Sequence, residues 1–76
     1  MYYPRLKDLR EDQELGQKEV AAVLGIDQRV YSTYEIGKRE IPTHLVIRLA
    51  DLYNTSTDYI LGLTDETKPY KRNRRP

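Results

Sequence analysis

Hydrophobic residues recur every three or four positions in five separate stretches of this chain, which is the spacing of a helix with one buried face. Gly, Pro or short polar runs separate the stretches, and none alternates between apolar and polar residues as a half-exposed strand does. The pattern predicts helices over about 4–12, 17–24, 28–36, 42–53 and 57–61. We therefore expect an all-α fold, with five short helices packed around one core.

A single tight turn separates the second and third predicted helices. The second helix ends at Gly25, and Asp27 stands two residues later, where it can cap the next helix. Ala21 is small at the point where the two helices should meet closely. Two short helices joined in this way form a helix-turn-helix, a motif that places its second helix in the major groove of DNA.

The third predicted helix divides into two faces. Val30, Tyr31 and Tyr34 have the spacing of a buried stripe, and no acidic residue, which would repel phosphate, occurs between residues 28 and 34. The side chains between them can form hydrogen bonds with base edges. An ordinary solvated helix face has similar residues, but the helix-turn-helix context favours DNA contact. The candidate base contacts are Gln28, Arg29, Ser32 and Thr33.

Further residues at fixed spacing extend this pattern along most of the chain. They are Gln17, Ala21, Gly25, Tyr34-Glu35, Gly37, Lys38-Arg39 and Pro42, followed by LADLY at 49–53 and DYILG at 58–62. In this order they resemble the Cro and phage-repressor family of bacterial regulators, also called the xenobiotic-response-element (XRE) family. The resemblance covers about residues 5–63 in one register and implies a lambda-repressor-like five-helix domain.

The resemblance also implies roles for individual residues. Gln28, Arg29, Ser32 and Thr33 would face the major groove, with the first two nearest the bases. Four residues would contact phosphates, the first of them with help from the dipole of its helix, namely Gln17, Lys38, Arg39 and Thr43. Arg10 and Glu35 resemble a structural pair that ties the first helix to the end of the third.

Three positions depart from the family pattern. Gly16 stands where Ser, Thr or Asn usually caps the second helix, so that side-chain bond is lost. Tyr31 replaces a usually aliphatic residue, and its hydroxyl needs a partner or points outward towards DNA. Val30 is bulkier than the usual small residue. These departures affect the expected rotation of the recognition helix.

The net charge of +1 conceals two regions of opposite sign. Residues 1–67 carry eight Lys or Arg against twelve Asp or Glu, a net charge of −4, whereas residues 68–76 carry five basic residues and no acid. We predict a DNA-binding domain over 1–66 and a basic, disordered C-terminal tail over 67–76. The tail could be an arm that binds DNA, a solubilising end or a docking segment for another protein.

Composition argues against several other classes of protein. The chain has no Cys and one His, His44, so we expect no metal site and no cofactor. No nucleophile or carboxylate lies at helical spacing from this His, and no Gly-rich phosphate loop is present, so we expect neither an enzyme nor a small-molecule ligand. No apolar run approaches the roughly 20 residues that cross a bilayer, which predicts a cytoplasmic protein without membrane contact.

The chain has seven Tyr but no Phe or Trp. We expect Tyr to replace Phe in the core, with hydroxyl groups that reach the surface. The residues concerned are Tyr2, Tyr3, Tyr53 and Tyr59.

The features together predict a sequence-specific transcriptional regulator, with double-stranded DNA as its partner. One unit contacts only half of an operator, so we expect a homodimeric repressor on a palindromic site, with recognition helices about 34 Å apart. The candidate dimer residues are Tyr59, Ile60, Leu61 and Leu63. The alternative is an antitoxin or a protein-interaction module with the same fold, which an apolar outer face on the recognition helix would favour.

Overall fold

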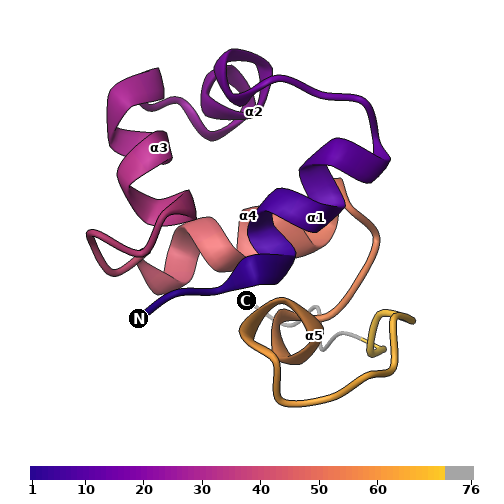
Figure 1. Ribbon diagram of the computed structural model, residues 1–76. Helices are drawn as coiled ribbons and strands as arrows, with labels where there is room; N and C mark the ends of the chain where they lie inside the picture. Colours follow the sequence, from indigo (N-terminus) through magenta and orange to yellow (C-terminus); the bar gives the residue numbers. More distant parts are fainter. Residues whose placement is uncertain (72–76) are drawn as a thin grey trace.

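The computed structural model describes residues 1–71, which form five helices and no strand, as the sequence predicts. The helices are α1 (Pro4–Asp12), α2 (Gln17–Leu24), α3 (Gln28–Glu35), α4 (Thr43–Leu52) and α5 (Thr57–Leu61). Figure 1 shows α2 and α3 on one side of the molecule, α1 and α4 across its middle and α5 below them. The domain measures 32 × 27 × 24 Å.

Local hydrogen bonds explain where the helices begin. Asp27 Oδ1 accepts a bond of 2.7 Å from the backbone of Arg29 at the start of α3. Ser56 Oγ accepts one of 3.0 Å from the backbone of Tyr59 in α5. At α2, where Gly16 has no side chain, the carboxylate of Glu19 accepts a bond of 2.9 Å from the Gly16 backbone. The missing cap is thus partly replaced from inside the helix.

The apolar faces of all five helices meet in one core, in which α1 packs on α3 and α5, and α4 packs on α2 and α5. Aliphatic side chains and the rings of Tyr31 and Tyr53 fill the space between the helices, so the two helices of the helix-turn-helix are fixed to the rest of the domain. The core consists of Leu6, Val20, Ala21, Leu24, Tyr31, Ile41, Leu45, Val46, Leu49, Ala50, Tyr53 and Ile60.

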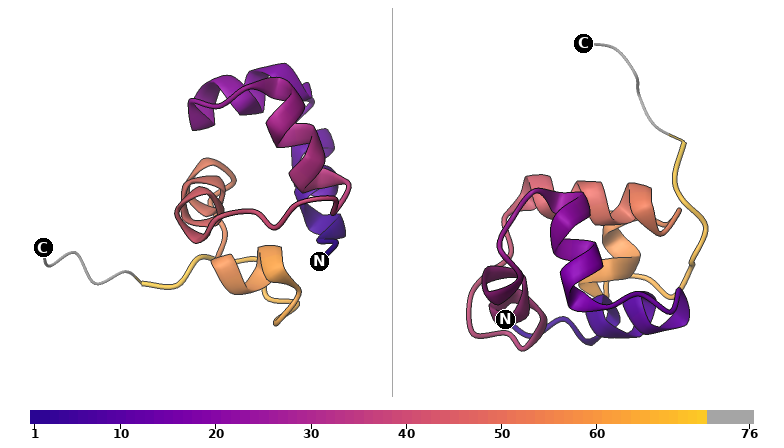
Figure 2. Two further views of the ribbon diagram at one scale, coloured as in Figure 1. Left: turned by 90° about the vertical axis from the view of Figure 1, so that its left-hand side faces the viewer. Right: turned by 90° about the horizontal axis from the view of Figure 1, so that it is seen from above.

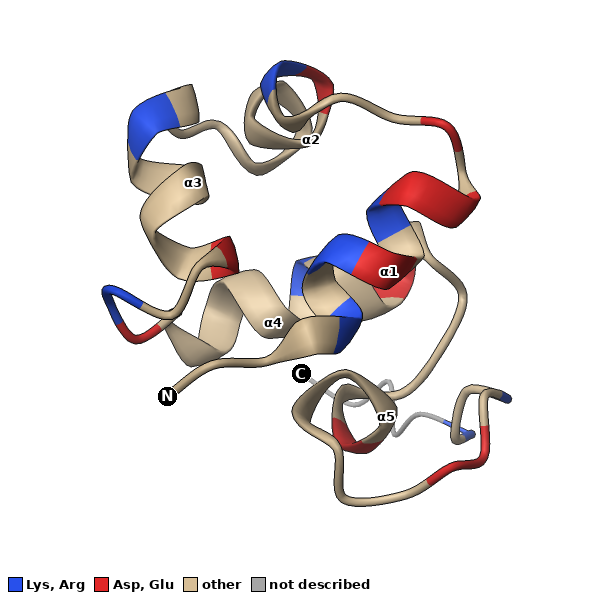
Figure 3. Ribbon diagram, viewed as in Figure 1, with Lys and Arg blue, Asp and Glu red and all other residues tan. Residues whose placement is uncertain are grey.

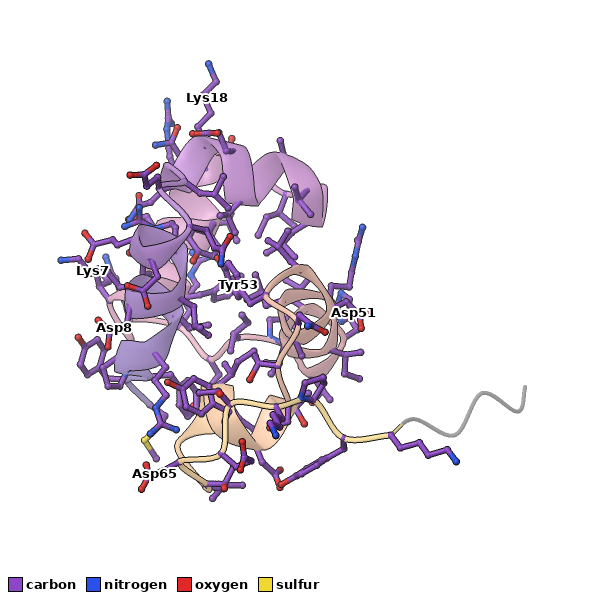
Figure 4. The ribbon with its side chains drawn as sticks, turned by 90° about the vertical axis from the view of Figure 1, so that its right-hand side faces the viewer. Lys7, Asp8, Lys18, Asp51, Tyr53 and Asp65 are labelled. Carbon is purple, nitrogen blue, oxygen red and sulfur yellow. The ribbon has the colours of Figure 1, made fainter. Side chains whose placement is uncertain are left out.

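The tyrosine prediction is wrong at two positions. Tyr2 is 57% exposed and lies outside the core. Tyr53 lies in the core, but its hydroxyl is buried instead of reaching the surface. Tyr53 projects from the end of α4 into the middle of the packed helices (Figure 4), so its ring is too deep for the hydroxyl to reach water.

The segment after α5 turns back along the domain. The guanidinium of Arg5 donates to the backbone oxygens of Tyr59 (2.7 Å) and Thr64, and lies 4.0 Å from the ring centre of Tyr59. Further on, the Thr55 hydroxyl donates to the backbone oxygen of Thr67 at 2.7 Å. The predicted tail therefore begins against the α4–α5 turn, and its residues 72–76 lie outside the described part of the chain.

Candidate nucleic-acid interface

The two helices of the motif pack at an angle through a short turn. Gly25 ends α2 with a φ of +70°, a conformation that few residues other than Gly adopt without strain. The backbone nitrogen of Ile26 donates to Ala21 at 3.0 Å, which closes the turn before Asp27 starts α3. Figure 2 shows α3 along one edge of the domain, so one of its faces is directed away from the core.

A buried ion pair fixes the inner face of α3. Arg10 donates two hydrogen bonds to the carboxylate of Glu35, of 2.8 and 2.9 Å, and a third of 2.8 Å to the backbone oxygen of Leu15. The two side chains are only 11% and 3% exposed. Burial alone would raise the pKa of Glu35, but the bonds from Arg10 hold it below its ordinary value. The pair joins α1 to the last residue of α3.

Two tyrosine hydroxyls lie near this ion pair. Within residues 1–71, neither the Tyr31 nor the Tyr53 hydroxyl has a partner of hydrogen-bond geometry. Burial raises the pKa of both groups, that of Tyr53 to about 12, and the neighbouring Glu35 carboxylate raises them further. Of the two orientations considered for Tyr31, the structure has the inward one, so this side chain does not face DNA.

The outer face of α3 carries the four candidate base contacts. Gln28 and Arg29 are exposed, and Ser32 and Thr33 are half-buried beside them. The hydroxyl of Thr33 donates 2.6 Å to the backbone oxygen of Val30, which leaves its oxygen as an acceptor. Figure 3 shows a basic segment in the first turn of α3, whereas the acidic residue at its other end is the buried Glu35.

The candidate phosphate contacts lie around this face. Lys38 and Arg39 are exposed in the loop after α3, and their backbone nitrogens both donate to the Thr33 oxygen, at 2.9 and 3.2 Å. Thr43 is exposed in the first turn of α4. The side-chain nitrogen of Gln17 instead points inward and donates to Glu35 at 3.3 Å.

Two further residues were not singled out in the sequence. Lys18 points away from the domain in the first turn of α2 (Figure 4), and its place beside Gln17 was the available signal. Arg48 donates from α4 to the backbone oxygens of Val23 (3.0 Å) and Leu24 (3.2 Å). It thereby caps the C-terminal end of α2, whose last carbonyls have no partner within the helix. No local pattern indicates this contact, because the two carbonyls lie 25 and 24 residues away.

A family model described as "Helix-turn-helix" matches residues 6–60, the span that contains α2, α3 and the Arg10–Glu35 ion pair. The chain belongs to the XRE family of helix-turn-helix transcriptional regulators. This XRE domain is 41% identical over 69 residues to the uncharacterized HTH-type transcriptional regulator YobD of Bacillus subtilis, covering 91% of this chain. It is also 41% identical over 64 residues to the HTH-type transcriptional regulator ImmR of the same organism, covering 84% of this chain.

A third relative is the cryptic phage CTXphi transcriptional repressor RstR of Vibrio cholerae, 34% identical over 53 residues and 70% of this chain. The match covers 62% of YobD, 50% of ImmR and 48% of RstR. A crystal structure of a transcriptional regulator from Listeria innocua has the same fold, with a TM-score of 0.77 at 24% identity over 88% of this chain and 63% of that one.

Two further findings concern metal binding and membrane-spanning helices. Within residues 1–71, no group of His, Cys, Asp or Glu side chains is arranged to hold a metal ion. None of the helices described is both long and apolar enough to span a bilayer.

Proposed function

We propose that this XRE domain is a sequence-specific DNA-binding regulator that contacts base edges in the major groove through the outer face of α3. One observation carries the proposal. Gln28 and Arg29 are exposed in the first turn of α3, and their side chains have no hydrogen-bond partner among the described residues, whereas a buried ion pair fixes the last residue of the same helix. Side chains free to pair, on a rigid support, are what direct contact with bases requires.

We also propose that two copies bind a palindromic operator and repress transcription by occluding the promoter. The name of the relative RstR supports repression. A groove lies between α4, α5 and the loop after α3. Its apolar lining residues are Tyr3, Ile41, Val46, Ile47 and Leu61, and its polar ones are Glu40, Thr43 and Thr57. Thr43, a candidate phosphate contact, lines its edge, so a second copy seated there would lie beside the first along the DNA. Such a regulator would act in the cytoplasm, where bacterial DNA is found.

Of the four residues predicted for a dimer, Leu61 lines this groove and is half-buried, and Leu63 is exposed beyond α5, outside the groove lining. Ile60 is buried in the core and is not available, and Tyr59 is engaged with Arg5. The exposed Ile47 is a better position for a test, because its replacement leaves the core intact.

The first experiment is selection of binding sites from random duplex DNA, followed by titration of the selected site. We expect a two-fold symmetric consensus with half-sites about one turn of DNA apart. The variant Arg29→Ala should relax the preference at one position in each half-site by about 1–3 kcal/mol. Lys7→Ala is a control that removes an exposed cation from α1, and it should leave the order of base preferences unchanged. Failure to enrich any sequence would contradict the proposal.

The dimer has a separate test. Sedimentation of Ile47→Glu and of the wild type, each with and without the selected duplex, compares their oligomeric states. We expect the wild type to bind the duplex as two copies and the variant to bind half-sites one at a time. Cooperative binding by Ile47→Glu would exclude this groove as the dimer interface.

A further inference from the structure

An exposed patch of large side chains lies next to the proposed DNA interface and was not predicted from the sequence. It consists of Tyr2 and Ile36, which are 57% and 62% exposed; Tyr2 packs on Gly37, and Ile36 precedes Gly37 in the chain. The loop that carries Lys38 and Arg39 continues directly from it. Tyr31 and Tyr53 are buried in the core, whereas Tyr2 and Ile36 are exposed. Large side chains exposed at one place indicate a contact with another molecule.

The end of the recognition helix holds Tyr2 in place. Gly37 has a φ of +78°, and a side chain there would approach Cα and Cβ of Tyr2 to 3.0 Å, so the close contact requires Gly. On the far side of the loop, the Met1 nitrogen lies 2.8 Å from Glu40 Oε1. Figures 1 and 2 show the first residues beside the loop after α3 in every view. Tyr2 is therefore presented at a defined position.

The patch continues the DNA-facing side of α3. Ile36 follows Arg29 by seven residues, which is nearly two helical turns, so the two side chains lie within about 20° of each other around the helix. A duplex that contacts Arg29 would therefore pass close to Ile36 and Tyr2.

The chemistry of the patch fits the sugar–phosphate backbone. A tyrosine hydroxyl is a phosphate donor, an aliphatic side chain can pack against deoxyribose, and the adjacent Lys38 and Arg39 neutralise charge. The carboxylate of Glu40, which would repel phosphate, is engaged by the Met1 nitrogen.

We propose that Tyr2 is a further DNA contact, whose hydroxyl donates a hydrogen bond to a backbone phosphate beyond the bases contacted by α3. This inference rests on the proposed function, since it assumes that α3 lies in the major groove. The contact adds affinity but no sequence information, because every nucleotide presents the same phosphate.

The test compares Tyr2→Phe with the wild type on the selected duplex at several salt concentrations. The variant keeps the backbone and Cβ contacts with Gly37 and loses only the hydroxyl. We expect roughly 3- to 30-fold weaker binding, with base preferences unchanged. The slope of log K against log salt should also stay the same, because a neutral phenol releases no counterion, whereas Lys38→Ala should lower it by about 0.9. Tyr70→Phe is the matched control, since Tyr70 is 54% exposed and bonds Asp58 in the C-terminal segment.

Duplexes with single methylphosphonate substitutions then locate the contact. At one phosphate in each half-site, the substitution should weaken the wild type more than it weakens Tyr2→Phe. Equal affinity of Tyr2→Phe and the wild type would overturn the inference while leaving the proposed function intact. The inference would also be overturned if the effect of Tyr2→Phe were the same whichever phosphate is substituted. A variant that lost only self-association would overturn it too, and would make the patch a protein contact. If the wild type selects no DNA sequence, the proposed function itself fails.

Discussion

The two faces of α3 are built on opposite principles. The inner face holds a charged pair that is almost fully buried, together with a tyrosine whose hydroxyl is enclosed. The outer face holds Arg29 in water, and Gln28 is exposed beside it in the first turn, both with no side-chain partner among residues 1–71. Burying charge is costly unless each group is paired and hydrogen-bonded, whereas exposed polar groups contribute little to folding. The inner face therefore controls where the helix lies, and the outer face is free to be used for binding.

The difference also separates two kinds of mutation. A change on the inner face acts through stability and helix position, so it affects every ligand of the domain alike. A change on the outer face should alter the preference for one ligand over another while folding is unaffected. The following predictions test this separation, from the largest expected effect to the smallest.

The largest effect is expected from Glu35→Ala, which leaves the Arg10 guanidinium buried without its partner. We expect a loss of about 3–5 kcal/mol in the free energy of unfolding, measured by urea denaturation. Glu40→Ala removes an exposed carboxylate from the adjacent loop and is the control, with an expected loss below about 1 kcal/mol. Similar losses in the two variants would remove the distinction between the faces.

Low pH should remove the stabilisation by the Arg10–Glu35 ion pair without any mutation. The pKa of Glu35 is below its ordinary value of 4.5 in the folded protein, so the unfolded state takes up a proton first as the pH falls. The stabilisation is complete above about pH 4.5 and is lost as the pH falls through the lower folded value. The stability difference between the wild type and Glu35→Gln should therefore shrink in acid. A difference that stays constant down to pH 2 would argue against a paired carboxylate.

Alkali tests the buried hydroxyls. Tyr53 keeps its proton in the folded protein up to a pKa of about 12, whereas an unfolded tyrosine loses it near pH 10. Stability should fall as the pH rises from 10 to 12, because the folded state binds more protons there than the unfolded state does. This one residue should account for a loss on the order of 2 kcal/mol by pH 12. Tyr53→Phe should make the decline less steep.

The smallest effect on folding is expected from the outer face. Gln28→Ala and Arg29→Ala should each change the free energy of unfolding by less than about 0.5 kcal/mol, because neither side chain has a partner to lose. Thermal unfolding of both variants beside the wild type measures this. A loss above 1 kcal/mol in either variant would show that the outer face supports the fold as well.

Local signals in the sequence were enough to predict the turn between α2 and α3 and the two faces of α3. Gly25 and Asp27 marked the turn of the motif, and both act through groups within four residues of themselves. The division of α3 into two faces followed from helical period, since Tyr31 and Glu35 share one side and Arg29 lies on another. These features depend on neighbours in the chain, so the sequence was enough to predict them.

The sequence could not predict which tyrosine enters the core. Tyr2 and Tyr3 are adjacent and chemically identical, yet Tyr3 packs against the core, whereas Tyr2 is 57% exposed and lies against Gly37, 35 positions away. The burial of the Tyr53 hydroxyl likewise depends on tertiary packing, and the charged groups that act on it, Glu35 and Arg10, belong to α3 and α1.

The sequence by itself determined the five helices, the turn between α2 and α3 and the polar outer face of α3. Only the tertiary structure decided that Arg48 caps α2, that Gln17 turns towards Glu35 and that Tyr2 lies beside the recognition helix. The reason is that helical period and capping act over a few residues. A contact between distant positions depends on the angles and distances at which helices pack, and these are set by the whole core at once.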